Sequence, residues 1–66
     1  MNIWVNGKER TVSEHITVAE LITELELTHE RIAVEHNRTI LSRTEFSTVT
    51  LQDGDVLEIV RFVGGG

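Results

Sequence analysis

The chain has 66 residues, a length that predicts a single small domain. It contains no cysteine, which excludes disulfides, thiolate metal sites and a cysteine nucleophile. The formal net charge of -5 argues against nucleic acid as a partner, because nucleic-acid binders usually present a basic face. No apolar run approaches the roughly 20 residues of a membrane span, and no signal peptide is recognisable. We therefore expect a soluble, cytoplasmic protein.

The first predicted element is a β-hairpin. Residues 1–6 alternate between apolar and polar, which places Ile3 and Trp4 on opposite faces of a half-buried strand. Asn6-Gly7 favours a type I′ turn, which needs positive φ at both of its central positions. Residues 8–13 are then expected to return as the second strand.

A helix is predicted next. Thr17 is a good N-cap, and Glu20, three residues later, completes a capping box. Apolar residues follow with the spacing of one helical face, at Val18, Leu21, Ile22 and Leu25. We expect the helix to run from about Val18 to Glu26, with Leu27 folding back under its end, although no glycine marks its C-terminus.

The middle of the chain predicts short elements. Residues 32–35 are expected to form a third strand, followed by a turn at Asn37-Arg38. Residues 39–41 are expected either to continue that strand or to start a short fourth one. The pairing of a serine at 42 with a glutamate at 45 indicates one helical turn, which would deliver Phe46 to the core. Residues 48–51 are short and β-prone, and Gln52 to Asp55 has turn composition.

The last strand is predicted over residues 56–63. It is apolar on both faces except at Glu58 and Arg61, which is typical of a strand with neighbours on both sides. Its partner of matching length is the first strand, and the two would run parallel with the helix in the crossover. The predicted fold class is therefore α+β, a small mixed sheet covered on one face by one helix.

Three glycines end the sequence. Glycine has no Cβ, so Gly64, Gly65 and Gly66 would form a thin, mobile peptide that can enter a narrow cleft. Extended, this tail reaches on the order of 10 Å, which would hold the carboxylate of Gly66 clear of the folded body. The alternative is a frayed end or a simple linker without a function.

Several stretches together resemble one family. They are the Asn6-Gly7 turn, Thr-Val-Ala-Glu-Leu-Ile at 17–22, Asp-Gly-Asp-Val-Leu-Glu-Ile-Val at 53–60 and Phe-Val-Gly-Gly-Gly at 62–66. The chain resembles ubiquitin-like β-grasp domains and, more narrowly, the ThiS sulfur carriers of bacterial thiamin biosynthesis. The resemblance covers essentially the whole chain. It implies a β-grasp domain over residues 1–63 and a flexible glycine tail over 64–66.

The resemblance also implies a mechanism. An E1-like adenylyltransferase of the ThiF type would use ATP-Mg to adenylate the carboxylate of Gly66. Sulfur from a cysteine desulfurase or a related donor would then give a thiocarboxylate, and thiazole synthase (ThiG) would take that sulfur into the thiazole ring. Gly64 and Gly65 would thread into these partners. The chain would act as a carrier rather than an enzyme, with no metal or cofactor bound to it.

A docking surface is expected on the outer side of the sheet. If Leu57 and Ile59 face the helix, then Val60 and Phe62 point the other way, and Trp4 could lie near them. Large exposed apolar residues usually mark an interaction site. The alternative is that another segment covers this face.

Other chemistry has weaker support. The three histidines (His15, His29, His36) fall in predicted connections without metal-ligand spacing. Asp53 and Asp55 flank a glycine, which favours hydrogen bonding at a turn over a cation site. Three further functions remain open: a sulfur carrier of another pathway such as molybdopterin synthesis, a ubiquitin-like protein modifier, and a non-covalent interaction module whose tail is inert.

Overall fold

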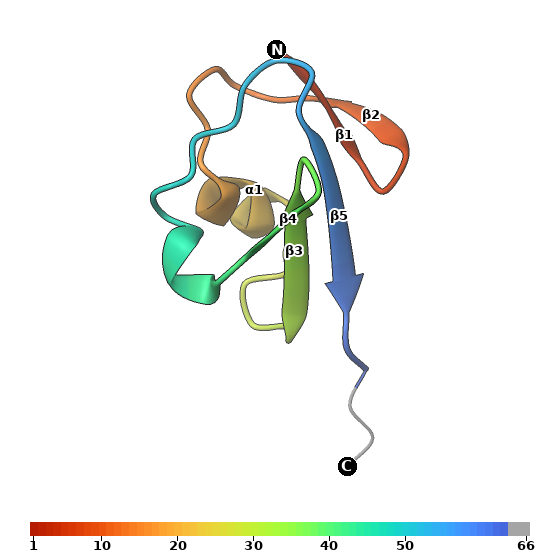
Figure 1. Cartoon of the computed structure of the whole chain (residues 1–66), viewed down its shortest axis with the longest axis vertical. Coiled ribbons are helices and arrows are strands. Elements are labelled where there is room, and N and C mark those ends of the chain that lie inside the picture. The colour runs from red at the N-terminus through yellow and green to blue at the C-terminus, as the bar shows by residue number, and fades with distance from the viewer. Residues whose placement is uncertain (64–66) are drawn as a thin grey trace.

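The computed structural model describes residues 1–63; the predicted tail, residues 64–66, lies outside the described part. The chain forms five strands, one α-helix and one turn of 3-10 helix (Figure 1). In chain order these are β1 (Asn2–Val5), β2 (Lys8–Thr11), α1 (Val18–Glu24), β3 (Ile32–His36), β4 (Thr39–Leu41), the 3-10 turn (Arg43–Glu45) and β5 (Val56–Arg61). No helix within residues 1–63 is long and apolar enough to cross a membrane.

The strands form one mixed sheet in the order β2-β1-β5-β3-β4. The last strand lies at its centre, parallel to β1 and antiparallel to β3. Both the central position and the parallel pairing with the first strand confirm the sequence-based prediction. Since the crossover between β1 and β5 contains α1, the predicted β-grasp arrangement is confirmed as well (Figure 1).

Two tight turns set the hairpins. Asn6 (φ 51°) and Gly7 (φ 81°) join β1 to β2, and Asn37 (φ 48°) and Arg38 (φ 72°) join β3 to β4. Positive φ at both central residues is the type I′ geometry, whose twist matches that of the flanking strands. The turn at Asn6-Gly7 is confirmed, and residues 39–41 form the separate fourth strand.

The helix begins as predicted and ends earlier than predicted. The Thr17 hydroxyl accepts from the Glu20 N–H at 3.1 Å, and the Glu20 carboxylate accepts from the Thr17 N–H at 2.8 Å, which completes the capping box. The last helical residue is Glu24 rather than Glu26. Glu26 adopts φ 59°, and the Leu27 N–H donates back to the Ile22 carbonyl at 3.0 Å, a Schellman-type ending.

The long connection before β5 closes one side of the core. The Glu45 carboxylate accepts from the Ser42 N–H at 2.7 Å, as expected for the predicted helical turn, and Phe46 is buried behind it. Residues 48–51 contribute a single bridge, Thr17 to Thr50, instead of a strand. A backbone bond from Val18 to Val49 (3.0 Å) ties this connection to the start of α1.

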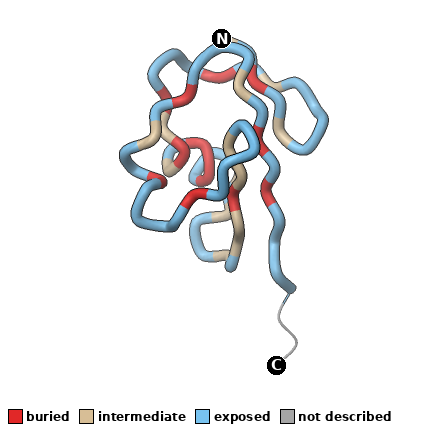
Figure 2. The backbone as a smooth tube through the Cα atoms, viewed as in Figure 1, coloured by how far each residue is buried: buried red, intermediate tan, exposed pale blue. Residues whose placement is uncertain are grey.

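The core lies between the sheet and α1. Buried and exposed positions alternate along β5, which Figure 2 shows as red segments between pale blue ones. Fully buried side chains from the sheet meet those of the helix, among them Ile3, Leu57, Val34, Val18 and Leu21. The same alternation leaves every second side chain of β1 and β5 on the other side of the sheet, away from the helix.

Candidate functional site

The last strand is anchored to β1 by both backbone and side-chain hydrogen bonds. The N–H groups of Trp4 and Asn6 donate to the carbonyls of Asp55 and Leu57, each at 2.9 Å. β1 ends there, but the Asn6 side chain continues the ladder. Its Oδ1 accepts from the Ile59 N–H at 2.7 Å and its Nδ2 donates to the Ile59 carbonyl at 3.1 Å. The amide group thus replaces one further strand residue, a role that the sequence analysis did not assign to Asn6.

On its other side β5 is paired with β3 from its second residue to its last. The register runs from His36 opposite Leu57 to Ile32 opposite Arg61. One further bond, from the Phe62 N–H to the Arg31 carbonyl (2.8 Å), holds the chain just beyond the strand. The regular strand ends at Arg61, two residues before its predicted end. β5 therefore carries the chain out of the body at the end opposite the N-terminus (Figure 1).

Gly64, Gly65 and Gly66, the residues expected to thread and to react, lie outside the described residues. The structure describes the chain up to Val63, which is the residue directly before them. The expected chemistry at Gly66 therefore stays a prediction.

The turn before β5 is built by its two aspartates. Asp53 Oδ1 accepts from the Asn2 N–H at 2.8 Å, and Asp55 Oδ2 accepts from the Gln52 N–H at 2.9 Å. Gly54 adopts φ 86°, a conformation that glycine adopts without steric cost. These contacts confirm the prediction that the aspartates make hydrogen bonds at a turn.

Asp55 also joins the turn to β3. His36 Nε2 lies 2.7 Å from Asp55 Oδ2, and Asn37 Nδ2 donates to Asp55 Oδ1 at 3.1 Å. Partial burial raises the pKa of Asp55, but hydrogen bonds from His36, the Gln52 backbone and Asn37 outweigh it and hold that pKa below its usual value. The expectation that all three histidines lie in connections is wrong for His36, which is the last residue of β3.

The outer side of the sheet presents large apolar side chains. The three predicted docking residues are all exposed: Trp4 by 42%, Val60 by 54% and Phe62 by 56%. Val56 (45%) and Ile40 (74%) share this property, and the sequence analysis did not select them. Val56 could have been found by extending the alternation of β5 back by four residues from Val60. No such signal identifies Ile40, because its face depends on how β4 pairs with β3.

Trp4 does not lie next to the other predicted docking residues. It pairs with Val56 at the start of β5, whereas Val60 and Phe62 lie at the other end. Four strand residues separate the two positions by about 13 Å. The outer face therefore has two apolar regions, one around Trp4 and Val56 and one around Val60.

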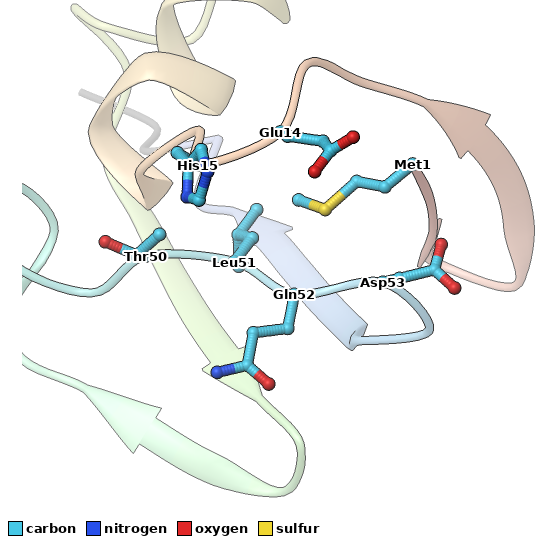
Figure 3. A pocket seen from close by; sticks show the side chains of 7 residues that line it. All are labelled: Met1, Glu14, His15, Thr50, Leu51, Gln52 and Asp53. Carbon is cyan, nitrogen blue, oxygen red and sulfur yellow. The ribbon is translucent and has the colours of Figure 1, made fainter.

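Another hollow lies away from this face. It has a volume of about 600 Å³ and is lined by Met1, Glu14, His15, Thr50, Leu51, Gln52 and Asp53 (Figure 3). The side chains of Met1 and Leu51 point into it, while those of Gln52 and Asp53 point away (Figure 3). Across residues 1–63 the structure brings together no group of three or more His, Cys, Asp or Glu side chains with the arrangement of a metal site. The hollow is also remote from the end of β5, so the candidate site is the outer sheet face together with that end.

Comparison with known proteins shows the family and the fold of the chain. The model of the ThiS family matches residues 3–66. The sulfur carrier protein ThiS of Bacillus subtilis is 36% identical over 63 residues, which cover 94% of this chain and 96% of that protein. The crystal structure of the thiamine biosynthesis protein ThiS from Geobacter metallireducens superposes with a TM-score of 0.85 at 40% identity, and covers both chains completely.

A second kind of relative is much longer. Thiazole synthases from Paramagnetospirillum magneticum and Magnetococcus marinus are 42% and 36% identical over all 66 residues. The chain spans only 20% of the length of each of these two proteins. The match to the family model extends over nearly the entire sequence and is supported by relatives of the same length and fold. The chain belongs to the ThiS family.

Proposed function

We propose that this protein carries sulfur on its C-terminal glycine for thiazole formation in thiamin biosynthesis. The observation that carries the proposal is the anchoring of β5. The strand is hydrogen-bonded on both sides up to Ile59 and on one side up to Phe62, and the sequence then continues directly into three glycines. A rigid strand followed by a peptide without side chains is suited to presenting a terminal carboxylate to another protein.

The proposed chemistry needs an activating enzyme. A C-terminal carboxylate is ionised at neutral pH, and its charge and poor leaving group make it a weak acyl electrophile. An E1-like adenylyltransferase of the ThiF type would join the Gly66 carboxylate to AMP and release pyrophosphate from ATP-Mg. Nucleophilic sulfur from a cysteine desulfurase or a similar donor would displace AMP and leave a thiocarboxylate. In this scheme the chain is a co-substrate of its partners and not an enzyme.

The relatives support a thiazole synthase as the acceptor of the sulfur. In two proteins named thiazole synthase, a segment similar to this chain accounts for a fifth of the length. Joining a carrier and an acceptor in one polypeptide would raise their effective concentration. A separate carrier would need a docking surface for the same purpose. Because activation uses ATP, we place the reaction in the cytoplasm.

The outer face of the sheet is the proposed docking surface. Large apolar side chains are exposed at both ends of β5, Trp4 and Val56 at its start and Val60 and Phe62 at its end, and Ile40 is exposed on the edge strand β4. Burying such side chains against a partner contributes a favourable free energy of about 25 cal/mol per Å² of apolar surface removed from water. Gly64 and Gly65 would then reach into the partner's active site.

The proposal is tested by ATP–pyrophosphate exchange with a ThiF-type enzyme. We expect exchange that depends on the full-length chain and is lost both in a variant lacking Gly66 and in a variant with one alanine added after Gly66. Loss in both variants would locate the reaction at the Gly66 carboxylate, because one residue more or less moves that carboxylate by about 3.5 Å. Exchange that survives the added alanine would contradict the assignment of the reaction to the Gly66 carboxylate, and absence of exchange with the wild-type chain would favour the non-covalent interaction module.

A further inference from the structure

The strand β2 carries backbone groups that point out of the sheet. It is an edge strand with β1 as its one neighbour (Figure 1). Just beyond it, the Val12 N–H donates to the Met1 carbonyl at 2.8 Å, and the Met1 amino group donates to the Val12 carbonyl at 2.9 Å. Such bonded pairs alternate with non-bonded pairs in an antiparallel ladder, so the N–H and carbonyl groups of Glu9 and Thr11 point away from β1. No other segment of residues 1–63 bonds to these four groups.

The side chains of this edge divide by charge. Arg10 lies opposite the fully buried Ile3, which places it on the side of the sheet that faces the core. Lys8, two residues earlier, shares that side, whereas Glu9 and Thr11 lie on the other. The core-facing row of this edge is therefore cationic, in a chain whose net charge is -5.

The guanidinium group of Arg10 is only partly satisfied. Its Nε atom is buried and has no hydrogen-bond partner within residues 1–63. The ion pairs of the described residues do not include this arginine. A buried N–H donor without an acceptor costs free energy. That cost is removed if the side chain turns toward a carboxylate, which can accept from Nε and from a terminal nitrogen of the guanidinium at once.

Pairing between two copies of this edge is unfavourable. An unpaired strand edge is a template for another strand, including the same strand of a second copy. The antiparallel arrangement that satisfies all four outward groups sets Glu9 of each copy opposite Thr11 of the other. It also sets Arg10 of the two copies directly opposite each other, and like charges in that position destabilise a sheet. An acidic strand would meet the same backbone groups without this repulsion.

From these observations we infer that β2 binds an extended, acidic segment of another protein as an additional strand of the sheet, with a carboxylate of that segment on Arg10. The outward groups of Glu9 and Thr11 fix the position of the segment through backbone hydrogen bonds. Side chains alternate along a strand, so acidic residues at every second position would all lie next to Lys8 and Arg10. The inference is independent of the proposed sulfur chemistry, because β1 separates this edge from β5.

The test uses two synthetic peptides and the full-length chain. The first is an acetylated and amidated hexapeptide in which threonine and glutamate alternate, and the second has lysine in place of glutamate. Each is titrated into isotope-labelled protein, and the backbone amides and the Arg10 side chain are followed by NMR. The net charge of -5 favours the lysine peptide over the surface as a whole, so tighter binding of the glutamate peptide reports the cationic row of β2.

We expect the glutamate peptide to bind saturably and about tenfold more tightly than the lysine peptide, because only its carboxylates can bond to Arg10. The amide protons of Glu9 and Thr11 should exchange more slowly with solvent in the complex. Those of Lys8 and Arg10, which already bond to β1, should change less. The Nε–H signal of Arg10 should shift as this group gains an acceptor.

A matched pair of variants tests the backbone contacts. Thr11→Pro removes an outward N–H at an edge position that accepts proline, and Thr11→Val loses the same hydroxyl but keeps the N–H. We expect Thr11→Pro to weaken binding of the glutamate peptide about tenfold and Thr11→Val to bind as the wild type does. Equal binding by the two folded variants would contradict the strand pairing.

The wild-type titrations decide the matter even if Thr11→Pro fails to fold. Saturable binding of the glutamate peptide, with protection of Glu9 and Thr11, supports the inference. Equal affinity for the two peptides, or no change at these two amides, would overturn it. Arg10 would then serve only to prevent β2 from pairing with a second copy.

Discussion

Asn6 links the first turn of the chain to its last strand. The residue adopts φ 51°, which asparagine tolerates better than most residues, and this conformation turns its amide group toward Ile59. Both polar atoms of the amide then bond to the Ile59 backbone. The side chain of a turn residue therefore extends the hydrogen bonding between β1 and β5 as far as Ile59.

Asn6→Gly removes these two hydrogen bonds and keeps a residue that accepts positive φ. We expect a loss of about 1–3 kcal/mol in the free energy of unfolding, because the Ile59 backbone groups lose their partners. The control is Arg38→Gly, at a position with φ 72° whose side chain makes no hydrogen bond within residues 1–63. This control should be neutral or stabilising. Urea denaturation measures both variants, and equal stability of the two would contradict the role assigned to Asn6.

Asp55 makes stability depend on acid pH. Its pKa is lower in the folded protein than in the unfolded chain, so its contribution is present above the unfolded pKa and is lost as pH falls through the folded pKa. The loss is therefore expected below about pH 4. Asp55→Asn should cost about 1 kcal/mol at neutral pH and flatten the acid dependence of the unfolding free energy. Asp53→Asn is the control, and a wild-type acid profile in Asp55→Asn would contradict this assignment.

The sequence identified the residues of this network only in part. Asp53 and Asp55 were predicted to bond at a turn because they flank Gly54, and that signal is local. The contacts of Asp55 with His36, and of Asn6 with Ile59, join residues 19 and 53 positions apart. Contacts of this kind depend on strand register, which local composition does not encode.

At the scale of elements, α1 shows how a local pattern can predict a start better than an end. The capping box predicted the first residue correctly, because Thr17 and Glu20 lie within one turn. The end has no glycine to mark it. Glu26 adopts the left-handed conformation instead, and Leu27, partly buried against the core, fixes the reversal. Burial of Leu27 thus determines the end of the helix.

This ending predicts that glycine is preferred to glutamate at position 26. Glu26→Gly should raise the free energy of unfolding by about 1 kcal/mol, since φ 59° costs an L-residue about that much. Glu24→Gly, at the last residue of the helix, should lower the free energy of unfolding by up to about 1 kcal/mol. Thermal or chemical denaturation of the two variants gives the sign directly. Destabilisation by both substitutions would contradict the Schellman-type ending.

At the scale of the whole molecule, one sheet separates a core from an exposed apolar face. The alternation of β5 predicted this division, and Leu57 and Ile59 face the helix while Val60 is exposed. The position of Trp4 relative to Val60 could not be predicted. It depends on the pairing of Trp4 with Val56, two residues that lie far apart in the sequence. The resemblance to the ThiS family predicted the β-grasp fold, in which the first and last strands pair.

The division into a buried and an exposed face predicts that two substitutions in the last part of the chain differ in their effect on stability. Phe62→Asp should leave the free energy of unfolding within about 0.5 kcal/mol of wild type, because the side chain is already exposed, and should weaken binding to the adenylating partner. Leu57→Ala, at a fully buried position, should cost about 2–5 kcal/mol. Unfolding of the Phe62→Asp variant would show that Phe62 belongs to the core.

The central claim is that Gly66 carries the sulfur, and the intact mass of the protein tests it most directly. The chain is incubated with a ThiF-type adenylyltransferase, ATP-Mg and a sulfur donor, beside a variant lacking Gly66. The account predicts a mass gain equal to the exchange of one oxygen for one sulfur in the full-length chain only. An unchanged mass in the presence of an enzyme that activates a known ThiS carrier would contradict it.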